Sequence, residues 1–137
     1  RPTVSALSPF DYAVLRVVPL VEREEFLNVG VILLCRPRAF LGVKIHLDIA
    51  RLLAFAPQAD VPAIQAHLHF ITDLVTGDPQ AGSLGELSPP ERFHWLTSPR
   101  STTIQVSPVH PGLCDDPAAA LHDLYARLVV GVESHLP

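Results

Sequence analysis

Lysine is almost absent from this sequence, and basic residues as a class are few. Lys44 is the one lysine, and the 10 lysine and arginine residues stand against 14 aspartate and glutamate residues, giving a formal net charge of −4. A chain with this balance has no broad basic field that would attract a phosphate backbone. The composition therefore argues against nucleic acid as the main partner.

Cysteines and long apolar runs are also scarce. Cys35 and Cys114 lie far apart in the sequence, and no CxxC spacing occurs, so neither a metal knuckle nor a dithiol redox motif is indicated. Two reduced cysteines are the simpler interpretation, and a disulfide between them stays open. No apolar run reaches the roughly 18 residues that a spanning helix needs, and no signal-peptide pattern is present. We therefore expect no membrane association and a cytoplasmic location.

The sequence contains no nucleophile motif, no phosphate-binding glycine loop and no metal-ligand cluster. His67 and His69 lie two positions apart in a predicted helix, so their side chains point about 200° apart and cannot hold one ion. We therefore predict no metal site and no cofactor.

The segment from Phe10 to Arg36 organises the chain. It contains two apolar strand candidates, residues 10–18 and 27–36, which are rich in β-branched residues and are joined by a charged connection. A third strand at residues 40–46 alternates apolar and polar side chains, and short connections favour an antiparallel meander. Both faces of the first strand are mostly apolar, as in a central strand that is covered on both sides.

Helical periodicity follows the meander. Asp48 is expected to cap a short helix that ends before Pro57, and Asp60 a longer helix that ends at Gly77. Residues 78–87 are expected to form a loop. The Ser88 to Glu91 segment predicts a capping box on a third helix. A fourth strand is expected at residues 102–106, then a loop at 109–115 and a final helix capped by Asp116.

These elements predict the α+β class. The length of 137 residues suits one domain. We expect a flexible leader at residues 1–9 and a single α+β domain at residues 10–137. In this domain an antiparallel sheet of about four strands has helices packed mainly on one face.

The acidic run Glu22, Arg23, Glu24 and Glu25 is the first candidate for function. Its carboxylates are suited to proton transfer or to binding a hard cation, although the spacing matches no known loop. The alternative is a solvated turn that keeps the neighbouring strands soluble. A sharper hypothesis pairs Glu25 with Arg16, because a charge in the middle of an apolar strand requires a partner.

The second candidate is the polar segment around the predicted fourth strand. Arg100 offers a planar fork for a carboxylate or phosphate, and His110 is suited to proton transfer. The remaining polar members of the segment are Ser98, Ser101, Thr103, Gln105, Ser107, Asp115 and Asp116. The alternative is a polar strand face that meets water, with loops shaped by proline and glycine.

Residues 10–33 and 93–125 together resemble the bacterial family catalogued as domain of unknown function 3037. The features that carry the resemblance are the strand ending in Arg16, the charged run ending at Glu25, Asn28-Val29-Gly30, Pro99-Arg100-Ser101 and Ser107-Pro108-Val109-His110. The resemblance implies no activity. It implies a genomic context, because such genes are often neighbours of kinase-like proteins of the HipA type.

Two functions follow from these features. The first is a binding or accessory module, with a HipA-type kinase-like protein as the candidate partner, and the absence of catalytic motifs favours it over an enzyme. The second is an enzyme acting on a small anionic or phosphorylated substrate through Arg16, Glu25, Arg100 and His110, which would have to converge in one cleft. A homo-oligomer stays open. The candidate contact residues are Arg16, Glu22, Glu25, Asn28, Arg100, Ser101, Gln105, Ser107 and His110.

Overall fold

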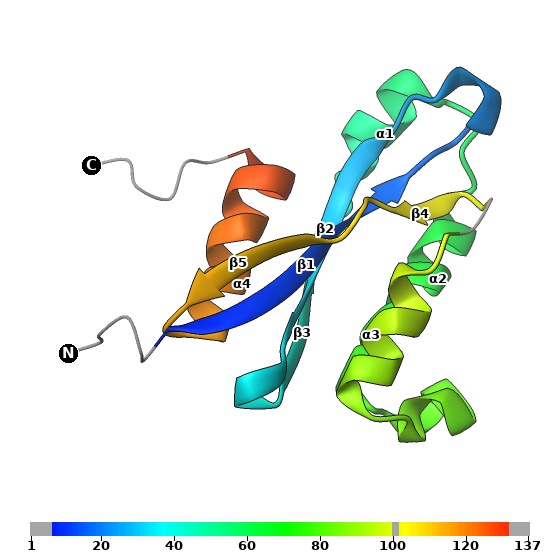
Figure 1. The fold of residues 1–137 in the computed structure, drawn as a ribbon. Helices are drawn as coiled ribbons and strands as arrows, with labels where there is room; N and C mark the ends of the chain where they lie inside the picture. Colours follow the sequence, from blue (N-terminus) through cyan, green and yellow to red (C-terminus); the bar gives the residue numbers. More distant parts are fainter. Residues whose placement is uncertain (1–6, 100–101, 132–137) are drawn as a thin grey trace.

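The protein is built around one long antiparallel strand, β1 (Ser8–Val17). The computed structural model describes residues 7–99 and 102–131 (Figure 1). The sheet has the order β3-β2-β1-β4, and β5 pairs with β1 on the same side as β4. The other strands are β2 (Leu27–Cys35), β3 (Phe40–Ile45), β4 (Ile104–Val106) and β5 (His110–Cys114). The predicted α+β class with an antiparallel sheet is confirmed.

A β-bulge interrupts the pairing of β1 with β2. Leu15 pairs with Gly30 and Arg16 with Asn28, so that Val29 is the extra residue. A Cβ atom at Gly30 would lie 2.9 Å from the Lys44 carbonyl oxygen, and glycine is therefore needed where β3 approaches β2. The bulge places Asn28 directly opposite Arg16.

The helices begin at the capping residues that the sequence predicts. The carboxylates of Asp48, Asp60 and Asp116 each accept a hydrogen bond from a backbone N–H of the first turn. Ser88 and Glu91 form the predicted capping box. The α-helices are α1 (Ile49–Phe55), α2 (Val61–Thr76), α3 (Pro89–Thr97) and α4 (Pro117–Tyr125). Shorter helical turns are η2 (Val21–Arg23), η3 (Arg36–Arg38), η4 (Pro79–Glu86) and the π-helical η5 (Ala126–Val130).

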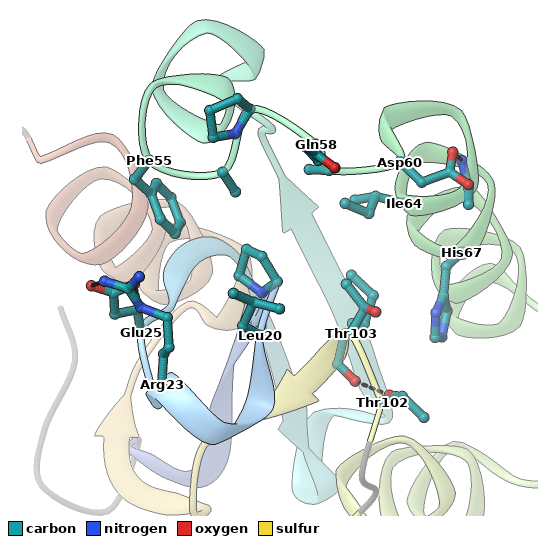
Figure 2. A pocket seen from close by; sticks show the side chains of 16 residues that line it. Leu20, Arg23, Glu25, Phe55, Gln58, Asp60, Ile64, His67, Thr102 and Thr103 are labelled. Atoms are coloured by element: carbon teal, nitrogen blue, oxygen red, sulfur yellow. Dashed lines mark hydrogen bonds and ion pairs between the residues drawn. The ribbon is translucent and has the colours of Figure 1, made fainter.

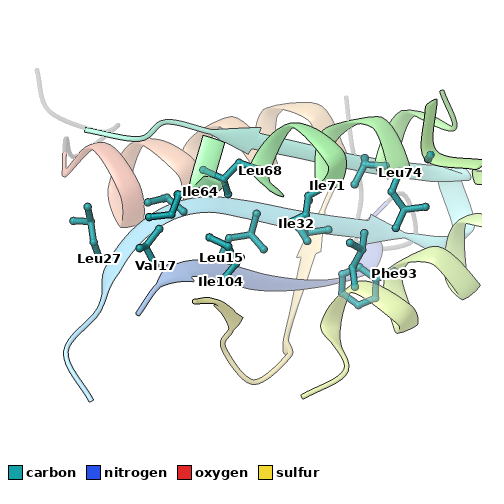
Figure 3. Packing of buried hydrophobic residues seen from close by; sticks show 14 of the residues in the cluster. Leu15, Val17, Leu27, Ile32, Ile64, Leu68, Ile71, Leu74, Phe93 and Ile104 are labelled. Atoms are coloured by element: carbon teal, nitrogen blue, oxygen red, sulfur yellow. The ribbon is translucent and has the colours of Figure 1, made fainter. Parts of the chain in front are cut away.

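The larger core lies between the sheet and the helices α1, α2 and α3. Leu15 and Ile32 from the sheet pack against Leu68, Ile71 and Leu74 of α2, and all five are at most 5% exposed (Figure 3). Apolar residues at spacings of three and four on α2 produce this contact face.

A second core occupies the other face of the sheet, where α4 and η5 pack. Val31, Leu33 and Cys35 of β2 contact this cluster, which also includes Cys114 and Leu121. The central strands are thus covered on both faces, as their doubly apolar sequence predicts, and α4 lies on the opposite side of the sheet from α2 and α3 (Figure 1). Cys35 and Cys114 are free thiols, and burial beside Cys35 raises the pKa of Cys114.

The structure differs from the sequence-based expectations in two places. Residues 109–115, expected to be a loop, contain β5, so the sheet has five strands. Residues 78–87, also expected to be a loop, contain the helical turns of η4. In addition, β1 begins at Ser8, inside the expected leader, whose residues 1–6 lie outside the described part of the chain.

Candidate functional site

A groove of about 730 Å³ opens between three segments that are distant in the sequence (Figure 2). One wall is the connection between β1 and β2, and the opposite wall is the start of α2 together with the α1–α2 linker. The approach to β4 lies along its side. The lining residues are Pro19, Leu20, Arg23, Glu25, Phe55 to Asp60, Ala63, Ile64, His67 and Thr102 to Ile104.

The surface of this groove is mainly apolar. Ile64 and Ile104 also belong to the larger core, and they form the buried part of the lining. Leu20 is 51% exposed and Phe55 is 39% exposed, so two large apolar side chains stand open to solvent at the groove. Such a surface suits an apolar group from a ligand or a partner protein.

The charged groups at the groove are engaged within the chain. The Arg23 guanidinium holds both oxygens of the Glu25 carboxylate, with Nε–Oε1 at 2.9 Å and Nη2–Oε2 at 3.1 Å. The Asp60 carboxylate caps α2 by accepting the Ala63 N–H at 3.1 Å. These groups therefore define a polar margin around apolar walls.

The local sequence explains both loop walls. Glu24 adopts a φ of 57°, so the chain turns sharply between Arg23 and Glu25. On the other side, α1 ends at Phe55 just before Pro57, and α2 begins after Asp60. The linker between these two helices is therefore held in place at both of its ends.

Arg16 does not line the groove. Its guanidinium carbon lies 4.2 Å from the centroid of the Phe26 ring, in a cation–π contact. The expected pairing of Arg16 with Glu25 is wrong, because Glu25 pairs with Arg23.

Arg16, Asn28 and Gln105 form one row across the sheet, since Asn28 on β2 and Gln105 on β4 are the direct cross-strand partners of Arg16. The Asn28 Nδ2 donates to the Leu128 carbonyl oxygen in η5 at 3.1 Å, so the row faces the side of the sheet that α4 and η5 cover. Ile104, the neighbour of Gln105, points to the other side and lines the groove.

Ser107 and His110 lie at other positions along β1. Ser107 is 3% exposed, and its hydroxyl accepts the Val14 N–H at 2.8 Å. His110 pairs with Tyr12 on β1, and their ring centroids are 5.3 Å apart. Arg16 follows Tyr12 by four positions along the strand, which is a distance of roughly 13 Å.

The structure therefore brings together only part of the predicted set. Arg16, Asn28 and Gln105 share one row, whereas Glu25 lines the groove and Glu22 is exposed on η2. Arg100 and Ser101 lie outside the described residues. Of the four residues proposed for an enzymatic cleft, the three described members do not meet in the groove, whose lining contains Glu25 alone among them.

Sequence reasoning missed the apolar residues of the groove and the Phe26 contact. Leu20, Phe55 and Ile64 come from separate elements, and nothing in their spacing indicates that they meet. Phe26 could have been noticed in the sequence, because a phenylalanine directly after four charged residues is expected at the surface. In the structure its side chain is 49% exposed.

Two further properties of the described residues bear on other functions. Within residues 7–99 and 102–131, no group of three or more histidine, cysteine, aspartate or glutamate side chains is placed to hold a metal ion. No helix in this part of the chain is both long enough and apolar enough to cross a membrane.

Comparison with known proteins gives one match. The family model described as "Protein of unknown function (DUF3037)" matches residues 12–129. No curated protein and no solved structure matches the chain. The matched region contains β1 from Tyr12 onward and the strands β2 to β5. It also contains the residues that line the groove and the row of Arg16, Asn28 and Gln105.

Proposed function

Because the chain belongs to the DUF3037 family, whose description assigns no activity, we propose from its groove that the protein is a binding module for another protein. The observation that carries this proposal is the apolar groove of about 730 Å³ with Leu20 and Phe55 open to solvent. Exposed apolar side chains around a concave surface are typical of interaction sites.

The internal pairing of the charged groups supports binding over catalysis. Glu25 is held by Arg23 and Asp60 caps a helix, so neither is left as an unpaired acid or base beside the apolar walls.

The partner that we propose is a kinase-like protein of the HipA type. The support is the genomic context that the family resemblance implies. In this complex the chain is an accessory protein, and an apolar segment of the partner occupies the groove. A homo-oligomer of the chain stays a separate prediction, which the mass of the purified protein in solution would test.

The test is co-expression with the neighbouring HipA-type protein, followed by size-exclusion chromatography and hydrogen exchange. The two proteins are expected to co-elute, and amide exchange in the complex is expected to slow at residues 19–25 and 55–60. The β3 edge, from Phe40 to Ile45, serves as an internal reference. Separate elution, or a complex that leaves the groove segments unprotected, would contradict the proposal.

A further inference from the structure

Arg16 is a half-buried arginine whose charge no group in the described chain compensates. Arg23, Arg36 and Arg127 each form an ion pair with a carboxylate of their own chain. Arg16 instead stacks on Phe26, and no hydrogen bond or ion pair to its guanidinium occurs among residues 7–99 and 102–131. A partly buried cation without a counter-charge is costly, so its retention on β1 requires an explanation.

The neighbours of Arg16 in the sheet cannot supply this counter-charge. The two residues beside it in the row, Asn28 and Gln105, carry neutral amides. One N–H of each side-chain amide is used within the chain, because Asn28 donates to the Leu128 carbonyl and Gln105 donates to the Thr102 carbonyl. Within the described part of the chain, the buried Arg16 Nε and the buried Asn28 Oδ1 both have no hydrogen-bond partner. Buried polar atoms without partners are rare in proteins and mark this row as unusual.

Part of the Arg16 side chain is accessible to solvent, because the residue is only half-buried. The Phe26 ring contacts the guanidinium on one side, with its centroid 4.2 Å from the guanidinium carbon. This contact restricts the fork before any ligand arrives, which lowers the entropic cost of binding.

The charges around this row favour a carboxylate over a phosphate. Arg16 is the one cation in the row, and one guanidinium fork matches one carboxylate in charge and in geometry. Exposed glutamates at positions 22, 24 and 25 precede Phe26, and the whole chain has a net charge of −4. A dianion would be repelled more strongly by this environment than a monoanion.

We propose that Arg16, seated on Phe26 and flanked by Asn28 and Gln105, is a receptor site for a carboxylate side chain of the partner protein. The inference rests on the proposed function, because the same partner occupies the groove. The two sites lie on opposite faces of the sheet and meet at the β1–β2 connection, where Glu25 lines the groove and the next residue, Phe26, contacts Arg16. A partner that wraps around this connection reaches both.

The scarcity of lysine allows a direct test in the complex. A carbodiimide activates a carboxylate, and a lysine amine in contact with it then displaces the urea and forms an amide bond. Lys44 is the one natural lysine, so the variant R16K adds a single new amine whose crosslinks mass spectrometry can locate. We expect a crosslink from position 16 to an aspartate or glutamate of the partner.

The matched control is R36K. Arg36 already holds Asp11 of its own chain at 2.9 Å, and it follows β2, at the opposite end of that strand from Asn28. We expect no crosslink to the partner from position 36. R16Q is expected to weaken the complex about 10- to 100-fold, as the loss of charge-assisted hydrogen bonds would, whereas R36Q leaves its affinity unchanged. A complex that forms normally with R16K but crosslinks only elsewhere would overturn the carboxylate site and leave the groove proposal standing.

A second measurement uses the wild-type chain alone and does not depend on the partner. The ¹³C NMR signals of the guanidinium carbons (Cζ) of Arg16 and Arg36, which do not depend on slowly exchanging protons, can be followed during titration with acetate and with inorganic phosphate. We expect the Arg16 signal to saturate at an acetate concentration at least 10-fold below that for Arg36, and phosphate to bind more weakly than acetate. Equal responses of the two arginines, or a preference for phosphate, would overturn the inference, whatever the fate of the groove proposal.

Discussion

Ser107 and Val14 exchange two hydrogen bonds, one of which uses a side chain in place of the backbone. The Ser107 N–H donates to the Val14 carbonyl oxygen at 2.9 Å, and the Val14 N–H donates to the Ser107 hydroxyl oxygen at 2.8 Å. The hydroxyl in turn donates to the Pro108 carbonyl. These hydrogen bonds lie between the end of β4 and the start of β5. The edge of β1 therefore stays hydrogen-bonded at Val14, where neither of the two strands pairs with it.

The variant S107A should therefore lower the free energy of unfolding by about 1–3 kcal/mol, because it leaves the buried Val14 N–H without an acceptor. Urea denaturation followed by circular dichroism measures this change. S98A is the control, since the Ser98 hydroxyl donates to the His94 carbonyl at an exposed position. The control should stay within about 0.5 kcal/mol of the wild type. An equally small effect for S107A would show that the hydroxyl is not a structural acceptor.

Cys114 should react slowly with alkylating reagents in the folded protein. Burial raises the pKa of its thiol, so a smaller fraction is thiolate, the reactive form, at neutral pH. Mass spectrometry after iodoacetamide treatment at pH 7.5 should show labelling of Cys114 at least about 10-fold slower than in guanidinium chloride. Comparable rates in the folded and unfolded protein would contradict this expectation.

The capping box of α3 should make stability depend on pH. The Glu91 carboxylate accepts the Ser88 N–H at 3.0 Å and the Ser88 hydroxyl at 2.8 Å, and the backbone hydrogen bond is the main reason that the pKa of Glu91 is lowered. A carboxyl group whose pKa is lower in the folded state stabilises the protein above its unfolded pKa, and this contribution is lost as the pH falls through the folded pKa.

E91Q keeps the shape of the cap but lacks the charge. The difference in urea midpoint between the wild type and E91Q should be present at pH 7 and should shrink below pH 4.5, the ordinary pKa of the group. A difference that stays constant or grows towards acid pH would show that the charge of Glu91 does not contribute.

Local sequence signals predicted most of the elements correctly. The three capping aspartates and the Ser88 capping box were recognisable, because a helix start is defined by residues that lie within one turn. β5 was missed for the opposite reason. Pro111 and Gly112 indicate a loop, and only the distant strand β1 supplies the pairing, with Pro111 tolerated because β5 is an edge strand.

The candidate site was less predictable than the fold. Arg16 was recognisable as a charge in an apolar strand, but its assigned partner was wrong, since the turn at Glu24 directs Glu25 to Arg23. No local sequence pattern predicts the groove, because its walls come from the β1–β2 connection, the α1–α2 linker, α2 and the approach to β4. Only the packed structure brings those segments together.

The central claim, that the groove binds a partner protein, is tested most directly by the dissociation constant of the complex with the HipA-type protein. Isothermal titration calorimetry would compare the wild type with the double variant L20S/F55S and with L113S. Leu113 is the matched control, because it is 66% exposed on β5 and does not line the groove. We predict that L20S/F55S weakens binding at least about 10-fold and that L113S has no effect. Equal dissociation constants for the wild type and L20S/F55S would contradict the claim.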